Sequence, residues 1–212
     1  MAPSPDPYDH RFIMRVDAHI LDIQPEIFRT IELPIDFNLA QLHDILQVSF
    51  GWTDSHLHQF NIGGLIYSAP EFFEEGLPQG SRLGEATEIR MNDFQFLFAG
   101  DGRALTIFYE YDFGDCWVHA LRLERVPREE GVRYPRCSAG SRSAPPEDVG
   151  GVRGYERFLR AWSDPDDEDH KALRRWAGPR FDPERCDLEQ INKAIARVVR
   201  AAGGDYRFRK NL

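Results

Sequence analysis

The strongest constraint on the fold is a pair of alternating runs between residues 104 and 125. Every second position of each run is apolar, aromatic or histidine, as expected for strands that bury one face. These positions are Leu105, Ile107, Tyr109 and Tyr111 in the first run, and Trp117, His119, Leu121 and Leu123 in the second. The segment between them, Asp112-Phe113-Gly114-Asp115, has the residue types of a tight turn. The two runs therefore predict an antiparallel hairpin.

Shorter strand signals lie on both sides of this hairpin. The expected strands are Phe12 to Leu21, with Met14, Val16, Ala18 and Ile20 on one face; Ile27 to Leu33, with Ile27, Phe28, Ile31 and Leu33 as core candidates; a hairpin from Phe60 to Tyr67 bent at Gly63-Gly64; and a short strand at Phe94, Phe96 and Phe98. Residues 68–82 and 127–154 are interrupted by proline and glycine, so we expect long loops there.

Helical spacing appears once early in the chain and then dominates the C-terminal third. The early helix is Leu39 to Phe50, with Asn38 as its N-cap and Gly51 at its end. The later helices are expected at Tyr155 to Ser163, His170 to Trp176 and Asp187 to about Arg200, the last with Asp187 and Gln190 in a capping pattern. Strands followed by helices predict an α+β fold: a mostly antiparallel sheet with helices packed on one face and a helical C-terminal third.

Composition bounds the organisation of the chain. Its 212 residues are 42% hydrophobic, which suits one domain over 11–203 between a disordered lead-in, 1–10, and a tail, 204–212. The three cysteines are widely spaced and suggest neither a disulfide framework nor a cysteine zinc site. No signal peptide or membrane-spanning run is visible, so we expect a cytoplasmic protein without a membrane partner.

Charge narrows the range of partners. The net charge of −9 argues against non-specific nucleic-acid binding, which depends on Lys and Arg neutralising phosphates. The one candidate basic patch is the stretch with Arg197, Arg200, Arg207, Arg209 and Lys210. A solvated, frayed terminus explains that stretch more simply. We therefore expect a protein or small-molecule partner.

The hairpin also carries a family resemblance. Its segment from Tyr109 to His119 closely resembles the hallmark of the plasmid pRiA4b ORF-3-like family. Residues Pro25 to Arg29 resemble an early Pro-x-Ile-Trp-Arg stretch of that family, with Phe28 in place of Trp. Further blocks agree in order: Leu42-His43, Phe50-Gly51-Trp52, His56 to Phe60, Tyr134-Pro135, Gly140, Pro145 to Gly151, Gly154-Tyr155, Phe181-Asp182-Pro183 and the final helix, so that the resemblance spans roughly residues 11–200.

This resemblance implies a single α+β domain of a family found in bacteria and archaea, often near plasmid or insertion-element genes. Some members carry a resolvase label, which makes a mobile-element DNA recombination protein one hypothesis for this chain. The sequence shows no catalytic serine in a recombinase-like context and no helix-turn-helix with basic flanks. Family members often carry cysteines where this chain has Ser143 and Val149, so a cysteine-dependent site is not expected here.

Polar and aromatic residues gather in three segments, 52–60, 112–119 and 145–155. We expect these segments to converge into the cleft of a binding or interaction domain. The candidate binding residues are His56, His58, Asp112, Asp115, Trp117, His119, Glu147, Asp148 and Tyr155. The alternative is that these residues hold the 127–154 loop onto the sheet, with His119 and the tryptophans in the core and the acids capping the helix near Tyr155.

A metal-dependent hydrolase or nuclease is the second hypothesis, and whether the chain is an enzyme stays open. In an extended segment, His56 and His58 would point the same way, as two imidazole ligands could. The candidate metal ligands are His56, His58, Asp115 and His119, to which Asp112, Glu147 and Asp148 would add further oxygen ligands. Nitrogen and oxygen ligands of this kind suit Zn, Mn or Fe.

Overall fold

A computed structural model describes residues 9–69, 83–97 and 104–201 of the chain. The expected lead-in lies almost wholly outside these residues, and so do most of the 68–82 loop, Phe98, and the C-terminal tail with Arg207, Arg209 and Lys210. Among the described helices, none is both long and apolar enough to cross a membrane.

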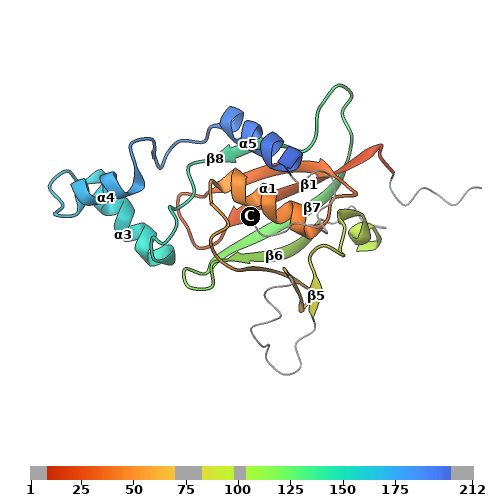
Figure 1. The fold of residues 1–212 in the computed structure, drawn as a ribbon, viewed down its shortest axis with the longest axis horizontal. Helices are drawn as coiled ribbons and strands as arrows, with labels where there is room; N and C mark the ends of the chain where they lie inside the picture. The colour runs from red at the N-terminus through yellow and green to blue at the C-terminus, as the bar shows by residue number, and fades with distance from the viewer. Residues whose placement is uncertain (1–8, 70–82, 98–103, 202–212) are drawn as a thin grey trace, which may run out of the picture.

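The described strands form one sheet in the order β5-β4-β3-β6-β7-β1-β2-β8 (Figure 1). Their bounds are β1 Phe12–Ile20, β2 Phe28–Pro34, β3 His58–Ile62, β4 Leu65–Ser68, β5 Leu83–Glu85, β6 Leu105–Tyr111, β7 Trp117–Pro127 and β8 Arg136–Ser141. Neighbouring strands are antiparallel except β4 and β5, which are parallel. The predicted hairpin is confirmed as β6 and β7, which pair from Leu105 opposite Leu123 to Tyr111 opposite Trp117.

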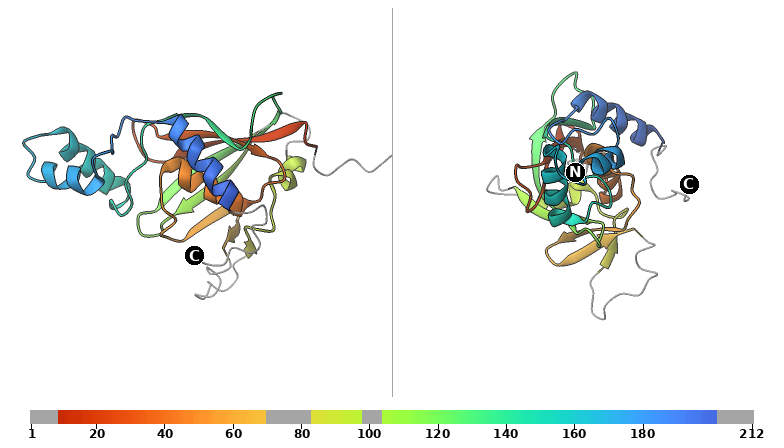
Figure 2. Two further views of the ribbon diagram at one scale, coloured as in Figure 1. Left: turned by 45° about the horizontal axis from the view of Figure 1, so that its top comes forward. Right: turned by 90° about the vertical axis from the view of Figure 1, so that its left-hand side faces the viewer.

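Helices α1 (Leu39–Phe50) and α5 (Leu188–Ala201) lie on the same side of the sheet (Figure 1). Helices α3 (Gly151–Ser163) and α4 (His170–Ala177) pack on each other beyond one end of the sheet, as both Figure 1 and Figure 2 show. The α+β class with a mostly antiparallel sheet and a helical C-terminal third is therefore confirmed. The pair α3 and α4 extends the molecule past the sheet.

The apolar stripe of α1 explains its position. Leu39, Leu42, Ile45 and Leu46 are fully buried against the sheet, because they recur at helical spacing. Asn38 caps the helix in a reciprocal capping box with Gln41, and Gly51 ends it at a φ of +85°. Both predicted ends of α1 are confirmed.

Several local predictions were wrong. The strand at Phe94 is a 3₁₀ helix, η1 (Met91–Leu97), where the amides of Met91 and Asn92 donate to the carbonyls of Phe37 and Ile35. Strand β8 lies inside the expected 127–154 loop, and its residues do not alternate in burial. Helix α3 begins at Gly151, four residues before the predicted start at Tyr155. Its N-cap is Gly150, which has no side chain, so Glu147 and Asp148 do not cap the helix. Phe28, a core candidate, is only half-buried.

Helix α5 is tied to the edge strand by one side chain. Asn192 accepts a hydrogen bond from the Cys137 amide (2.8 Å) and donates to the Cys137 carbonyl (2.9 Å). A neighbouring strand would satisfy the same two groups, so Asn192 stands in for one at the edge of the sheet. Ile191 and Ile195 bury the helix face beside it.

We predict that Asn192→Ala lowers the free energy of unfolding by about 2 kcal/mol, because it leaves two backbone groups of the buried Cys137 without partners. The matched control is Lys193→Ala on the same helix, which removes an exposed pair with Glu189 and costs less than about 0.5 kcal/mol. Urea unfolding of both variants measures the difference. Equal costs would contradict the role given to Asn192.

Candidate functional site

The three predicted segments meet at one corner of the sheet, in a group that we call the junction cluster: His56, Asp112, Glu147 and Asp148. His56 Nε2 lies 3.2 Å from a carboxylate oxygen of Asp148, 3.6 Å from one of Asp112 and 3.9 Å from one of Glu147. Asp112 is buried, whereas Asp148 is exposed. The cluster therefore opens to solvent on the Asp148 side.

Asp112 is held by the turn that it starts. Its backbone is left-handed, with φ of +57°, and its Oδ1 accepts from the amides of Gly114 (2.9 Å) and Asp115 (3.3 Å). This is the local bonding that lets aspartate occupy such turns. Because Oδ1 is committed to the turn, Oδ2 is the oxygen that faces His56.

Glu147 anchors the 145–151 loop to two other segments. Its carboxylate accepts from the Thr53 amide at 2.8 Å and from the Tyr111 hydroxyl at 3.1 Å. Burial and the adjacent Glu147 charge raise the pKa of Tyr111, so the phenol keeps the proton that it donates. Glu147 thus joins the loop after α1 to the end of β6.

Asp115 lies outside the junction cluster and holds the start of α3. Its Oδ2 accepts from the Gly150 amide at 3.1 Å. The next residue, Gly151, has φ of +66°, and a Cβ there would lie 2.6 Å from the Asp115 carbonyl oxygen. The hairpin turn and the start of α3 are therefore packed backbone against backbone.

The structure does not bring the four candidate metal ligands together. His56 lies in a bend before β3, where its ring contacts that of Tyr111, whereas the ring of His58 contacts that of Tyr109. His56 belongs to the junction cluster, His58 stacks on His43, and Asp115 binds the Gly150 amide. His119 lies in the core. The proposed ligand set of His56, His58, Asp115 and His119 is corrected accordingly.

Three further candidates are buried in the core. Trp117 and His119 have no exposed surface, and Tyr155 is 1% exposed. His119 packs edge-on against Phe50 and Trp52, and its Nδ1 lies 2.9 Å from the Trp117 carbonyl oxygen. Burial lowers the pKa of His119 to about 4, so the ring is neutral and Nδ1–H is the donor. These side chains support the walls of the site from inside.

Sequence reasoning missed a second polar group, which we call the buried histidine group: His43, Asp54 and His58. The rings of His43 and His58 stack with centroids 3.4 Å apart and planes 9° apart. His43 Nε2 lies 2.8 Å from Asp54 Oδ1, and its Nδ1 lies 2.9 Å from the Tyr109 hydroxyl. The available signal was the place of His43 on the apolar stripe of α1, next to Leu42.

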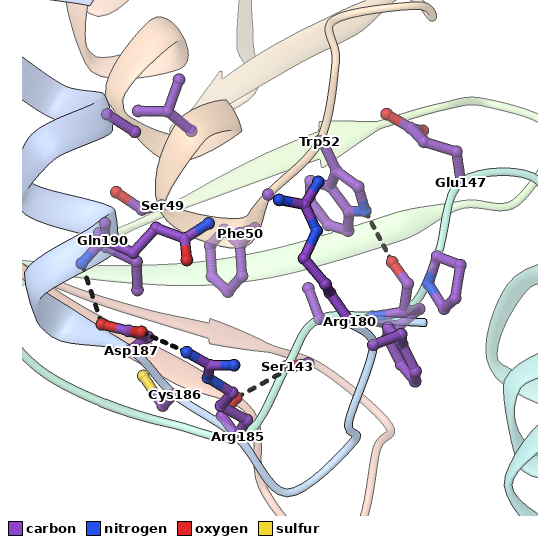
Figure 3. A pocket seen from close by; sticks show the side chains of 18 of the residues that line it. Ser49, Phe50, Trp52, Ser143, Glu147, Arg180, Arg185, Cys186, Asp187 and Gln190 are labelled. Carbon is purple, nitrogen blue, oxygen red and sulfur yellow. Dashed lines mark hydrogen bonds and ion pairs between the residues drawn. The ribbon is translucent and has the colours of Figure 1, made fainter. Parts of the chain in front are cut away.

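A pocket of about 650 Å³ lies between the end of α1, the 143–147 segment, the 177–187 segment and α5 (Figure 3). Phe50 and Trp52 form one wall, and the indole Nε1–H of Trp52 donates to the Pro145 carbonyl at 2.9 Å. Figure 3 shows Arg180 reaching out over the pocket from the opposite segment. Glu147 belongs both to the pocket lining and to the junction cluster, so the two adjoin. Of the three predicted cleft segments, 112–119 does not line this pocket.

The pocket lining includes a buried cation, Arg29, which is 2% exposed. Its guanidinium donates to the carbonyl oxygens of Phe28, Ser49, Ser141 and Arg142 at 2.7–2.8 Å. No carboxylate of a described residue forms an ion pair with it. Burial lowers the pKa of Arg29, yet arginine stays charged at neutral pH. The positive charge at the pocket is therefore not neutralised by the described residues.

The comparisons with known proteins agree with the hallmark in the hairpin. The model of a family described as plasmid pRiA4b ORF-3-like protein matches residues 12–190. A relative, uncharacterized protein y4hQ of Sinorhizobium fredii, is 30% identical over 185 residues, covering 86% of this chain and 90% of the relative. The crystal structure of MM3350, a protein of unknown function from Methanosarcina mazei Go1, superposes with a TM-score of 0.71 at 34% identity, covering 84% of this chain and 96% of that chain.

We predict that Gly151→Ala destabilises the protein by about 2 kcal/mol more than Gly131→Ala. Both glycines have positive φ, +66° and +76°, so both variants bear the left-handed strain of alanine. Only at Gly151 does the new methyl group meet another atom, the Asp115 carbonyl oxygen, whereas nothing lies within 4 Å at Gly131. Denaturant unfolding of the pair measures the contact, and indistinguishable costs would show that α3 does not start against the turn.

Proposed function

We propose that this chain, which belongs to the plasmid pRiA4b ORF-3-like family, is a ligand-binding domain. Its ligand is a small organic anion with an apolar part, and the pocket beside Trp52 is the site. The observation that carries this proposal is the Arg29 guanidinium, a buried positive charge in the lining of an open pocket, without a carboxylate partner among the described residues. An anion in the pocket would supply the missing countercharge.

The size and lining of the pocket suit such a ligand. A volume of about 650 Å³ falls in the range of small-molecule sites. Its apolar surface comes from Phe50, Trp52 and Phe181. The hydroxyl of Ser49, a residue 1% exposed, has no hydrogen-bond partner in the described part of the chain and is a polar anchor for the ligand.

The charge of the lining favours an anion as well. Arginine contributes Arg29, Arg180, Arg185 and Arg197, against the acids Glu147 and Asp187. Arg185 is paired with Asp187 at 2.6 Å, and Glu147 is engaged by Thr53 and Tyr111. Arg180 and Arg197 form no ion pair with a described residue, so they are available to a ligand. Arginine is well suited to carboxylate and phosphate groups, which it can bind bidentately.

The junction cluster extends this site. Glu147 belongs to both, and through it His56, Asp112 and Asp148 adjoin the pocket without lining it; in this proposal they bind donor groups of the ligand or of a protein partner that presents it. Asp115, Trp117, His119 and Tyr155 act indirectly, since they hold the loops and the walls in place. His58 belongs to the buried histidine group and has a separate role.

The dye anilinonaphthalene sulfonate tests the proposal, since it combines an anion with apolar rings. We predict saturable binding, and a loss of affinity of roughly tenfold or more in Arg180→Glu/Arg197→Glu, because the variant reverses two charges at the pocket. Fluorescence titration measures the affinity.

Two controls accompany that titration. Arg175→Glu/Arg200→Glu reverses two exposed charges that do not line the pocket and leaves the affinity unchanged. The neutral dye phenylnaphthylamine loses little affinity in either variant, because it has no charge to recognise. An equal loss in both double variants, or no saturable binding by the wild-type chain, would refute the anion site.

A further inference from the structure

We propose that His43, Asp54 and His58 form a binding site for a divalent transition-metal ion, and that Zn²⁺ is the ion that this ligand set fits best. One ligand atom from each residue lies within 4.8 Å of the others. This site is separate from the pocket and goes beyond the proposed anion binding. Of the metal ligands predicted from the sequence, this site contains only His58, and its two other ligands are His43 and Asp54.

The two imidazoles lie against each other in the interior. Their rings stack at 3.4 Å and are almost fully buried, His43 at 4% and His58 at 7% exposure. A shared ion lies in the plane of each ring that binds it, so metal binding rotates one ring out of this stack. Burial, with the neighbouring His43, holds the pKa of His58 well below its usual range. A neutral imidazole is the form that binds a metal, so no proton has to be removed from His58 first.

A hydrogen-bond chain fixes the orientation of His43. Gln47 Nε2–H donates to the Tyr109 hydroxyl at 3.0 Å, and that hydroxyl lies 2.9 Å from His43 Nδ1. The Asp54 carboxylate only accepts, so without metal the His43 proton sits on Nε2, which donates to Asp54 Oδ1 at 2.8 Å.

Metal binding at Nε2 exchanges this tautomer for the other. The ring stays neutral with its proton on Nδ1, where the Tyr109 oxygen accepts it. Burial raises the pKa of Tyr109 well above its usual range, so the hydroxyl remains a neutral partner. A ligating histidine held through its second nitrogen is the usual arrangement in metal sites.

His58 supplies the observation that points to a ligand. Its Nε2 is buried and has no hydrogen-bond partner among the described residues. Buried polar atoms are almost always satisfied, so an orphaned ring nitrogen beside another histidine and a carboxylate calls for a missing partner. A metal ion bound to Nε2 satisfies the lone pair that the neighbouring protein groups leave free.

The third ligand, Asp54, lies between the buried rings and the solvent. The Asp54 side chain is 45% exposed, while that of His43 is 5% exposed, so an ion reaches the buried rings past the carboxylate. Two histidines and one carboxylate leave positions open for water, as in zinc sites with three protein ligands. The backbone of Asp54 is fixed by its amide, which donates to Gln47 Oε1 at 3.0 Å.

Titration of the untagged, metal-stripped chain with Co²⁺ tests this site, because bound Co²⁺ absorbs visible light and Zn²⁺ displaces it. We predict one Co²⁺ per chain, with affinity reduced roughly tenfold or more in Asp54→Asn. That variant keeps an oxygen for the His43 Nε2–H but loses the charge, and its side chain is partly exposed, so the fold is retained. Zn²⁺ also shifts the ¹⁵N resonances of the His43 and His58 rings.

The matched control is Asp148→Asn, which removes the corresponding charge from the junction cluster, the other group that could hold a metal ion among the described residues. We predict that it leaves the Co²⁺ affinity unchanged. Failure of the wild-type chain to bind Co²⁺, unchanged affinity in Asp54→Asn, or loss of binding in Asp148→Asn alone would each overturn the proposal.

Discussion

The guanidinium of Arg29 joins three elements of this fold that are distant in the sequence. It starts from β2 and donates to carbonyl oxygens at the end of α1, in β2 itself, and at the end of β8. Charge-assisted bonds to buried carbonyls are stronger than neutral ones, and they fix the helix end and the last strand relative to each other. The same atoms place a positive charge in the lining of the pocket. Structure and proposed recognition therefore depend on one buried cation.

Two tyrosines of β6 contact both polar groups on the helix-covered face of the sheet, the buried histidine group and the junction cluster. Tyr109 and Tyr111 are two residues apart, so both point to the same side. Tyr109 reaches His43 and Gln47, and Tyr111 reaches Glu147 and the Ser55 amide. Burial raises the pKa of each phenol, which keeps both as neutral hydrogen-bonding groups. One strand thus supports the buried histidine group and the junction cluster.

Local periodicity was enough to predict the β6–β7 hairpin and α1, because their patterns and end residues lie next to each other in the chain. Strand β8 could not be predicted, since it is defined by pairing with the distant β2 and does not alternate in burial. The grouping of the histidines depended on partners from distant segments, His43 for His58 and Asp148 for His56, which alternation does not reveal. Nothing in the short segment Pro25 to Arg29 indicated that Arg29 would be buried, because its partners come from residues 49, 141 and 142.

The anomalous signal from a crystal soaked with para-bromobenzoate shows whether an organic anion occupies the pocket beside Trp52. This anion has an apolar ring, a carboxylate and a bromine atom that can be located without bias. We predict a bromine peak in this pocket, with the carboxylate turned toward the arginines of the lining. A fully occupied pocket in which the carboxylate faces away from Arg29, Arg180 and Arg197, or a bromine peak only outside the pocket, would contradict it.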